Sequence, residues 1–275
     1  MAMRHLKKAS TAQLIQEAIT FAGDEPSYAT DNYRLRIRVL CQRKPGVPIF
    51  DAAVALCESE DRISKCVGTD ILDALNADWK RYHFPFAERS APVLDRLLDD
   101  PDANVVLAAL QAISQLGGVP AARLVPLAEH ASMKVRFGLI DALSIEEDDI
   151  ALRTVIALSQ DEDGRVRDWA TFRLGTSQID SAPIREALVA RLKDSDDDAR
   201  GEAIVGLARR QDPRVAQAIG PELDFQTTSK RPNDFAVEAA ELMPSRAYVP
   251  ALELMLARDP ENERISNALA RCRGA

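Results

Sequence analysis

The side chains that most often carry enzyme chemistry are few and scattered in this sequence. The three histidines, His5, His83 and His130, lie far apart and do not stand at metal-ligand spacing from one another or from a cysteine. The sequence contains no GxSxG nucleophile motif, no P-loop and no GxGxxG phosphate-binding loop. We therefore expect a protein that has no catalytic residue, no bound metal and no cofactor.

The cysteines and one acidic run offer two further routes to a site, and both favour a structural role. The cysteines are Cys41, Cys57, Cys66 and Cys272. They form no CxxC pair and fall within helical patterns, so we expect buried free thiols. The acidic run from 194 to 198 resembles the start of an EF-hand calcium loop. That loop needs Gly and Glu where this chain has Ala199 and Val205, so we do not expect calcium binding.

Three arginines, Arg136, Arg167 and Arg200, recur at one position of successive sequence units and should form a ladder. Such a ladder can line a groove that binds phosphate or carboxylate groups, including those of a DNA backbone. It can also be a structural ladder in which each arginine pairs with carboxylates of the nearby turns. The structural interpretation is favoured, because the preceding unit has Val106 at this position and the chain is acidic throughout.

Trp169 and Phe172 are the aromatic residues best placed to contact a partner. They are three residues apart and so share one face of a helix, and the aligned positions in other units are often polar. If this helix is the second of a stacked helix pair, it lines the concave surface of the stack, where exposed aromatic side chains are typical interface anchors. Alternatively, the two rings fill a gap between repeats. The candidate partner-binding residues are this pair and the three ladder arginines.

Acidic residues gather at the turns that precede the second helices, and we expect them to lie along one rim. The rim residues are Asp161, Glu162, Asp163, Asp196, Asp197 and Asp198. Carboxylates at such positions cap free N–H groups and interact favourably with the helix dipole. Capping and solubility would account for most of them.

The net charge of −8 at pH 7 favours a basic protein as the partner, because an acidic surface attracts and steers cationic molecules. Non-specific nucleic-acid binding depends on cationic contacts to phosphate, so nucleic acid is disfavoured. The first ten residues are charged and are followed by no apolar segment, which argues against a secretory signal. No apolar stretch is long enough to cross a membrane. We expect a cytoplasmic protein that does not bind membranes.

An internal repeat of about thirty residues positions these side chains. It is clearest where residues 161–175 align with 194–208, and it recurs at 100–113 and 130–143 and more weakly at 235–243 and 263–272. A small or aliphatic pivot occupies the same place in each unit: Ala109, Leu139, Ala170, Ala203, Ala239 and Ala268. Apolar residues spaced by four around each pivot indicate one buried helix face.

Each unit is predicted to be a helix hairpin. Pro92, Pro183 and Pro250 should lie in the first turn of a first helix, where proline is tolerated. The four helices expected before the regular repeats span 11–22, 31–43, 49–58 and 62–77, with loops at 23–30 and 44–48 and an irregular connector at 77–90. The predicted fold is an all-α, right-handed, armadillo-like α-solenoid of about seven or eight antiparallel helix pairs. We expect a single domain over 1–275, with divergent repeats in 1–90 and regular ones in 91–275.

The repeat phrase D-x-x-x-x-V-R-x-x-A-x-x-x-L-G, seen at 161–175, resembles short HEAT repeats of the phycobilisome-lyase type. Residues 164–215, with TDNYRLRIRVL and DAAVALCESEDRISKCVGTDIL upstream, resemble bacterial HEAT-repeat proteins of the YibA type. Proteins of that family are regarded as immunity factors paired with Rhs-type toxins. The resemblance implies a protein-binding scaffold that neutralises a toxin domain. A bilin-lyase-like enzyme and a protein that binds nucleic-acid backbone through the arginine ladder are the alternatives.

Overall fold

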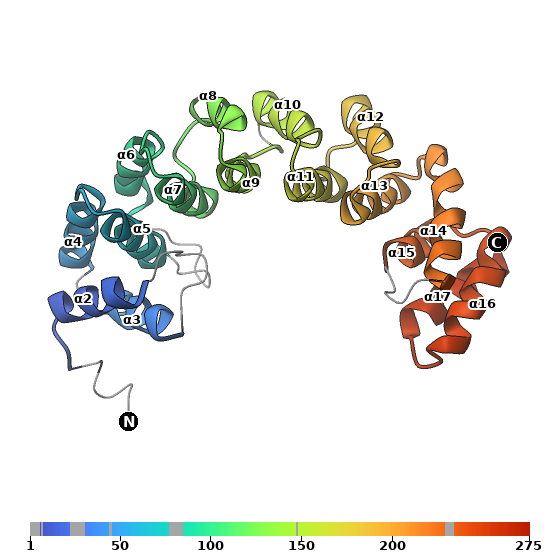
Figure 1. Cartoon of the computed structure of the whole chain (residues 1–275), viewed down its shortest axis with the longest axis horizontal. Helices are drawn as coiled ribbons and strands as arrows, with labels where there is room; N and C mark the ends of the chain where they lie inside the picture. Colours follow the sequence, from blue (N-terminus) through green and yellow to red (C-terminus); the bar gives the residue numbers. More distant parts are fainter. Residues whose placement is uncertain are drawn as a thin grey trace. The chain divides into compact units, whose positions relative to one another are not determined.

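The computed structural model describes Leu6 and residues 8–22, 31–43, 46–76, 85–146, 148–228 and 234–275. These residues form sixteen α-helices and no strand, so the predicted all-α fold is confirmed (Figure 1). The chain divides into two compact units, an N-terminal unit of residues Met1–Ser144 and a C-terminal unit of residues Ile145–Ala275. In the described part of the chain, no helix is long and apolar enough to cross a membrane.

The N-terminal unit is built from consecutive helix pairs. Its helices are α2 (Thr11–Ala22), α3 (Asp31–Cys41), α4 (Val47–Cys57), α5 (Arg62–Asn76), α6 (Ala87–Leu97), α7 (Ala103–Leu116), α8 (Ala121–Leu124) with the 3₁₀ turn η2 (Val125–Glu129), and α9 (Met133–Ala142). Helix α2 packs on α3, α4 on α5, α6 on α7, and η2 on α9. The second helices also pack on one another, α5 on α7 and α7 on α9, which makes the stack continuous. The four helices predicted before the regular repeats are confirmed to within two residues at each end.

The C-terminal unit repeats the same plan. Its helices are α10 (Asp149–Leu158), α11 (Gly164–Thr176), α12 (Ala182–Arg191), α13 (Asp197–Arg209), η3 (Pro213–Val215) with α14 (Ala216–Thr228), α15 (Asp234–Leu242), η4 (Arg246–Tyr248) with α16 (Val249–Arg258), and α17 (Glu263–Gly274). Here α11, α13, α15 and α17 are the second helices, and each packs on the next. Figure 1 shows α11 and α13 side by side, on the opposite side of their pairs from α10 and α12.

The pivot residues explain why the second helices stack. All six predicted pivots are buried with no solvent exposure. Small side chains at these places let neighbouring helices approach closely. One close approach joins α11 and α13 at Gly175 and Gly206, where a Cβ added to Gly206 would lie 2.8 Å from the Cα of Gly175. The repeat register read from the sequence is therefore the register of the packing.

The acidic turns cap the second helices, as predicted. Asp102, Asp163 and Asp196 each accept a hydrogen bond from the first free N–H groups of the following helix. The aspartate two residues earlier accepts the N–H of the capping residue itself at 2.9 Å in all three turns. At the start of α9 the Nδ1 atom of His130 fills that place, accepting from the N–H of Ser132 at 3.0 Å. The D-x-D pattern thus builds each turn as well as its cap.

One predicted helix start was wrong. Pro183 and Pro250 lie in the first turns of α12 and α16 as expected, but Pro92 lies inside α6, which begins at Ala87. The earlier start follows from Phe86, whose N–H donates to Oδ1 of Asn76 at 2.8 Å and whose ring stacks on Phe50 at 5.0 Å. The hydrogen bond and the ring stacking of Phe86 compensate for the backbone hydrogen bond that Pro92 cannot donate. Residues 87–90 of the predicted connector are therefore helical, and residues 77–84 lie outside the described residues.

Candidate partner-binding face

The second helices of the C-terminal unit place Trp169 and Phe172 together on one face. Both side chains are half-buried, and their rings stack with centroids 4.9 Å apart and planes inclined at 21°. Stacking restrains the two side chains before any partner binds, so little rotamer freedom is left to lose on association. The predicted pairing of these rings is confirmed; their contact with a partner stays a prediction.

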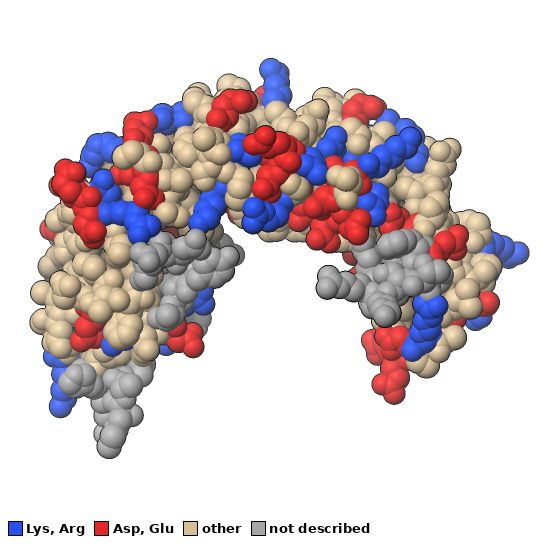
Figure 2. Space-filling model, in the orientation of Figure 1, with Lys and Arg blue, Asp and Glu red and all other residues tan. Residues whose placement is uncertain are grey.

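An acidic cluster of Asp168, Asp198, Glu202 and Glu238 lies beside the aromatic pair on α11, α13 and α15. Burial and the nearby Asp198 and Asp196 raise the pKa of Asp168 to about 6. Burial and the neighbouring carboxylate of Asp168 raise the pKa of Glu202 to about 7. On the visible side of the molecule, Figure 2 shows acidic side chains gathered over α11 and α13. The described cations around the cluster balance only part of its negative charge.

The cations near this cluster already have partners. Arg209 pairs with Glu238 at 2.8 Å and only partly offsets the charge around Glu202. Arg200 donates to Glu222 and to Asp197 at 2.9 Å, on the turn side of α13. No group of three or more potential ligands within the described ranges could hold a metal ion. Among the described residues, Arg209 is the cation that lowers the pKa of Glu202, and neither Asp168 nor Glu202 forms an ion pair.

Each ladder arginine donates a hydrogen bond to a carbonyl of the turn that precedes its own helix. Nη1 of Arg167 donates to the carbonyl of Asp161 at 2.9 Å, and Nη1 of Arg200 donates to that of Asp194 at 2.8 Å. In the N-terminal unit, Arg136 is buried and donates in the same way to the carbonyl of His130 at 2.9 Å. Each arginine thus closes the turn that begins six residues before it. This geometry is that of the structural ladder, and a partner contact by these arginines remains a prediction.

Asp194 joins one repeat to the next. Its carboxylate is 3% exposed and accepts two hydrogen bonds from Arg167, at 2.9 and 3.0 Å, and a third from Arg191 at 2.9 Å. Burial opposes ionisation, but these guanidinium groups hold the pKa of Asp194 below its ordinary value. In the N-terminal unit, Lys65 stands at the Arg167 position of α5 and pairs in the same way with Asp100 at 2.6 Å.

The predicted acidic rim divides into two groups. Asp161, Asp163 and Asp196 are half-buried and are used in turns and caps. Glu162, Asp197 and Asp198 are exposed. Capping therefore accounts for half of the rim, and the exposed half extends the negative surface beside the acidic cluster.

Comparison with known proteins now adds to the geometry. No family model matches the chain. It is 28% identical over 240 residues to YibA of Escherichia coli, covering 84% of this chain and 82% of that protein. The chain is therefore similar to YibA over most of both proteins. The X-ray structure of Escherichia coli YibA has a TM-score of 0.73 at 24% identity and covers 100% of this chain and 96% of that one.

A second solved structure, of an engineered protein, has a TM-score of 0.55 at 15% identity and covers 99% of this chain and 82% of that one. At these identities both structural matches show the fold alone. Together with the YibA match they support the predicted helical-repeat architecture. The toxin-neutralising role is not contained in them.

Several residues of interest had no distinguishing signal in the sequence. Glu202 and Glu238 align with Trp169 in the repeat, and Asp168 lies one position earlier, so the register places them on neighbouring second helices; their burial and mutual repulsion come from the packing. Cys57, Cys66 and Cys272 are buried free thiols as predicted, while Cys41 is half-buried at the wall of a pocket in the N-terminal unit. That pocket, between α3 and α5, was not predicted.

Proposed function

We propose that this protein is a cytoplasmic, non-enzymatic binding protein that neutralises a basic toxin domain by binding it at the second-helix face of the C-terminal unit. The observation that carries the proposal is a stacked aromatic pair on the same helix as Asp168, together with carboxylates that the described cations balance only in part. A rigid aromatic anchor beside a desolvated charge is the usual composition of a protein-binding hot spot.

The electrostatics favour a lysine- or arginine-rich partner. Crowding and burial make the ionised forms of Asp168 and Glu202 costly in the free protein. A cation placed between them would remove that cost and gain a charge-assisted hydrogen bond. The net charge of −8 would also attract a basic partner from a distance and raise the association rate.

The toxin as partner is suggested by the relationship to YibA. The similarity extends over most of both chains, which supports a shared role more strongly than a match confined to one repeat would. The resemblance to YibA-type immunity factors then supplies the partner class. The nucleic-acid alternative loses support from the ladder, because Arg167 and Arg200 direct donors to carbonyls of their own turns and Arg167 also pairs with Asp194 of the next turn.

The experiment is co-expression with the toxin domain encoded beside this gene. We expect a co-purifying complex and protection of the cells. The double variant Trp169→Ala with Phe172→Ala should weaken the complex at least about tenfold, which corresponds to roughly 1.4 kcal/mol of binding free energy. Truncation of one hot-spot side chain commonly costs more than that. Asp168→Asn with Glu202→Gln should do the same, and more strongly at low salt.

Matched controls come from the first helices of the same unit. Leu254→Ala on α16 removes an apolar side chain that is 58% exposed, and Glu186→Gln on α12 removes a carboxylate that is 67% exposed. Both controls should bind as the wild type does. Unimpaired binding by the aromatic double variant would move the interface elsewhere, and absence of any complex or protection would refute the toxin partner.

A further inference from the structure

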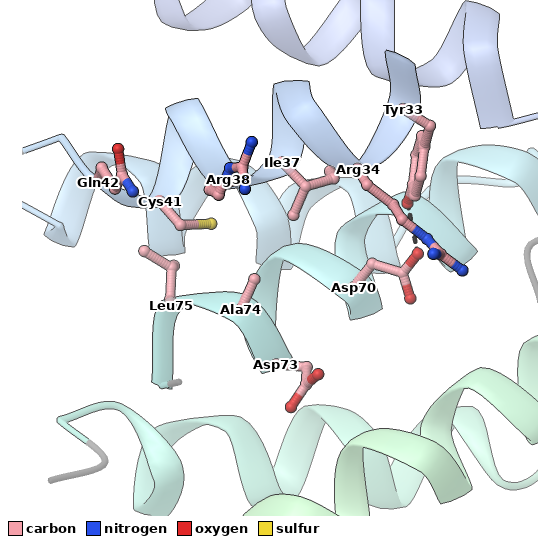
Figure 3. A pocket seen from close by; sticks show the side chains of 10 residues that line it. All are labelled: Tyr33, Arg34, Ile37, Arg38, Cys41, Gln42, Asp70, Asp73, Ala74 and Leu75. Atoms are coloured by element: carbon pink, nitrogen blue, oxygen red, sulfur yellow. Dashed lines mark hydrogen bonds between the residues drawn. The ribbon is translucent and has the colours of Figure 1, made fainter. Parts of the chain in front are cut away.

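A pocket of about 720 Å³ lies between α3 and α5 in the N-terminal unit (Figure 3). One wall is α3, which contributes Tyr33, Ile37 and Cys41, and the other is α5, which contributes Asp70 and Asp73. The volume is within the range of small-ligand sites, roughly 300–1,000 Å³. The pocket is remote in sequence from the aromatic pair and the acidic cluster and is a separate feature of the molecule.

The two carboxylates of this pocket form no ion pair with any cation in the described part of the chain. Asp70 accepts a hydrogen bond from the hydroxyl of Tyr33, which uses one carboxylate oxygen. Asp73 makes no hydrogen bond or ion pair with any of the described residues. Burial raises the pKa of both to about 6, and the neighbouring Asp73 adds to the rise at Asp70. At neutral pH the pocket therefore holds partly desolvated negative charge.

Two arginines also line the pocket but do not neutralise it. Arg34 and Arg38 are exposed on α3, and neither forms an ion pair with Asp70 or Asp73. No arginine lowers the pKa of either aspartate. An exposed guanidinium group is hydrated and gains little free energy by pairing with an anion. A half-buried carboxylate gains more free energy by pairing with a cation. A cationic ligand would therefore complement the charge of this pocket.

Apart from the polar Gln42, the remaining lining is apolar. Ile37, Ala74 and Leu75 form aliphatic surface next to the carboxylates. This combination suits a ligand with a cationic head that donates several hydrogen bonds and with an alkyl stem that packs on hydrocarbon. The described residues here offer no group of three His, Cys, Asp or Glu side chains that could enclose a metal ion, and the aliphatic lining favours an organic cation.

We propose that this pocket binds an alkyl-guanidinium or alkyl-ammonium group, with the charge against Asp70 and Asp73 and the stem against Ile37, Ala74 and Leu75. The group is either an arginine or lysine side chain of a protein partner or a free small amine. The inference goes beyond the proposed function, because it concerns a different unit and does not require a toxin. Its test uses small probes and so fails or succeeds independently of complex formation.

The full chain is titrated at about pH 7.5 with N-acetyl-arginine amide and, in parallel, with N-acetyl-citrulline amide. Citrulline has nearly the same shape but no charge. Binding is followed by calorimetry and by amide NMR shifts of α3 and α5. We expect the arginine probe to bind and the citrulline probe to bind at least about tenfold more weakly. Equal binding of the two probes, or no binding of the arginine probe, would overturn the proposal.

Variants localise the binding. Asp73→Asn should weaken the arginine probe about tenfold, whereas Glu60→Gln, which removes an exposed carboxylate of the same unit, should leave it unchanged. Asp70→Asn keeps an acceptor for Tyr33 and serves as a second test if the first variant folds poorly. Arg38→Gln should leave binding of the cation unchanged or tighter. Binding that is lost in Arg38→Gln and kept in Asp73→Asn would show an anion site and contradict the proposal.

Two further titrations distinguish the sources of the cation. Tighter binding of agmatine than of the capped arginine would support a free small amine. Binding of the capped arginine at least as tight as that of agmatine, with weaker complex formation by Asp73→Asn, would support a side chain of a protein partner. In both outcomes the pocket recognises the same chemical group.

Discussion

Replacing Glu202 by Gln should stabilise the protein at neutral and alkaline pH while weakening partner binding. Glu202 is half-buried on α13, next to Asp168 and Glu238, and these surroundings disfavour its ionised form. Glutamine has the same shape and no charge, so the substitution removes the repulsion without opening a cavity. The stabilisation of the free protein and the loss of affinity would have one cause, uncompensated charge kept on a binding face.

The sign and size follow from the pKa of this group. It rises from 4.5 to about 7, so the folded protein binds the proton more tightly than the unfolded chain does, and stability falls as pH rises between those values. Since one pKa unit corresponds to about 1.4 kcal/mol, the upper limit is about 3 kcal/mol, and solvent around the partly exposed side chain reduces it to about 1–2 kcal/mol. At pH 4 the wild type and the variant should be nearly equally stable.

Urea denaturation of both proteins between pH 4 and pH 8.5 measures this difference. We expect the free energy of unfolding of Glu202→Gln to exceed that of the wild type at pH 8 and to converge with it at pH 4. Glu186→Gln, at an exposed site on α12, is the control for a simple loss of one negative charge. Destabilisation at pH 8, or an equal effect of the control, would refute the argument from local crowding.

Three other changes test the fold and the class of function. Asp194→Ala should cost about 3–5 kcal/mol in urea denaturation, because it leaves Arg167 and Arg191 without their buried partner, whereas Asp197→Ala, at a site 67% exposed, should cost under about 1 kcal/mol. Gly206→Ala should lower the melting temperature by several degrees, since its Cβ would force α11 and α13 apart. Incubation with a bilin should leave no covalently bound pigment by absorbance after denaturation; attachment would support the lyase alternative.

Much of the fold could be predicted because its signals are local. The pivot residues recur about every thirty positions, and a small side chain in the middle of a helix face is enough to indicate where neighbouring helices meet. The D-x-D turns likewise contain their own structure, since each aspartate bonds to N–H groups within three residues. Such interactions depend only on the chain close by, and the sequence displays them directly.

The candidate sites were harder to predict from the sequence, because they depend on contacts between helices that are distant along the chain. Trp169 and Phe172 share a helix, so their pairing follows from spacing. Glu202 and Glu238, the acidic neighbours of the aromatic pair, come from α13 and α15, thirty or more residues further along the chain. Pro92 was placed at a helix start because proline usually occurs there, but Phe86 and its anchor on Asn76 move the start by five residues.

The sequence by itself determined the helical repeat, the turns that divide it and the acidic balance of its surface. These properties follow from periodicity, capping and composition, which require no knowledge of distant contacts. Only the tertiary structure decided what the charges do. It directed the ladder arginines to carbonyls of their own turns and crowded Asp168 against Glu202. It also placed Asp70 and Asp73 in a pocket where neither pairs with a described cation. Burial and separation in space set the energy of a charge, and neither is written in the spacing of residues along the chain.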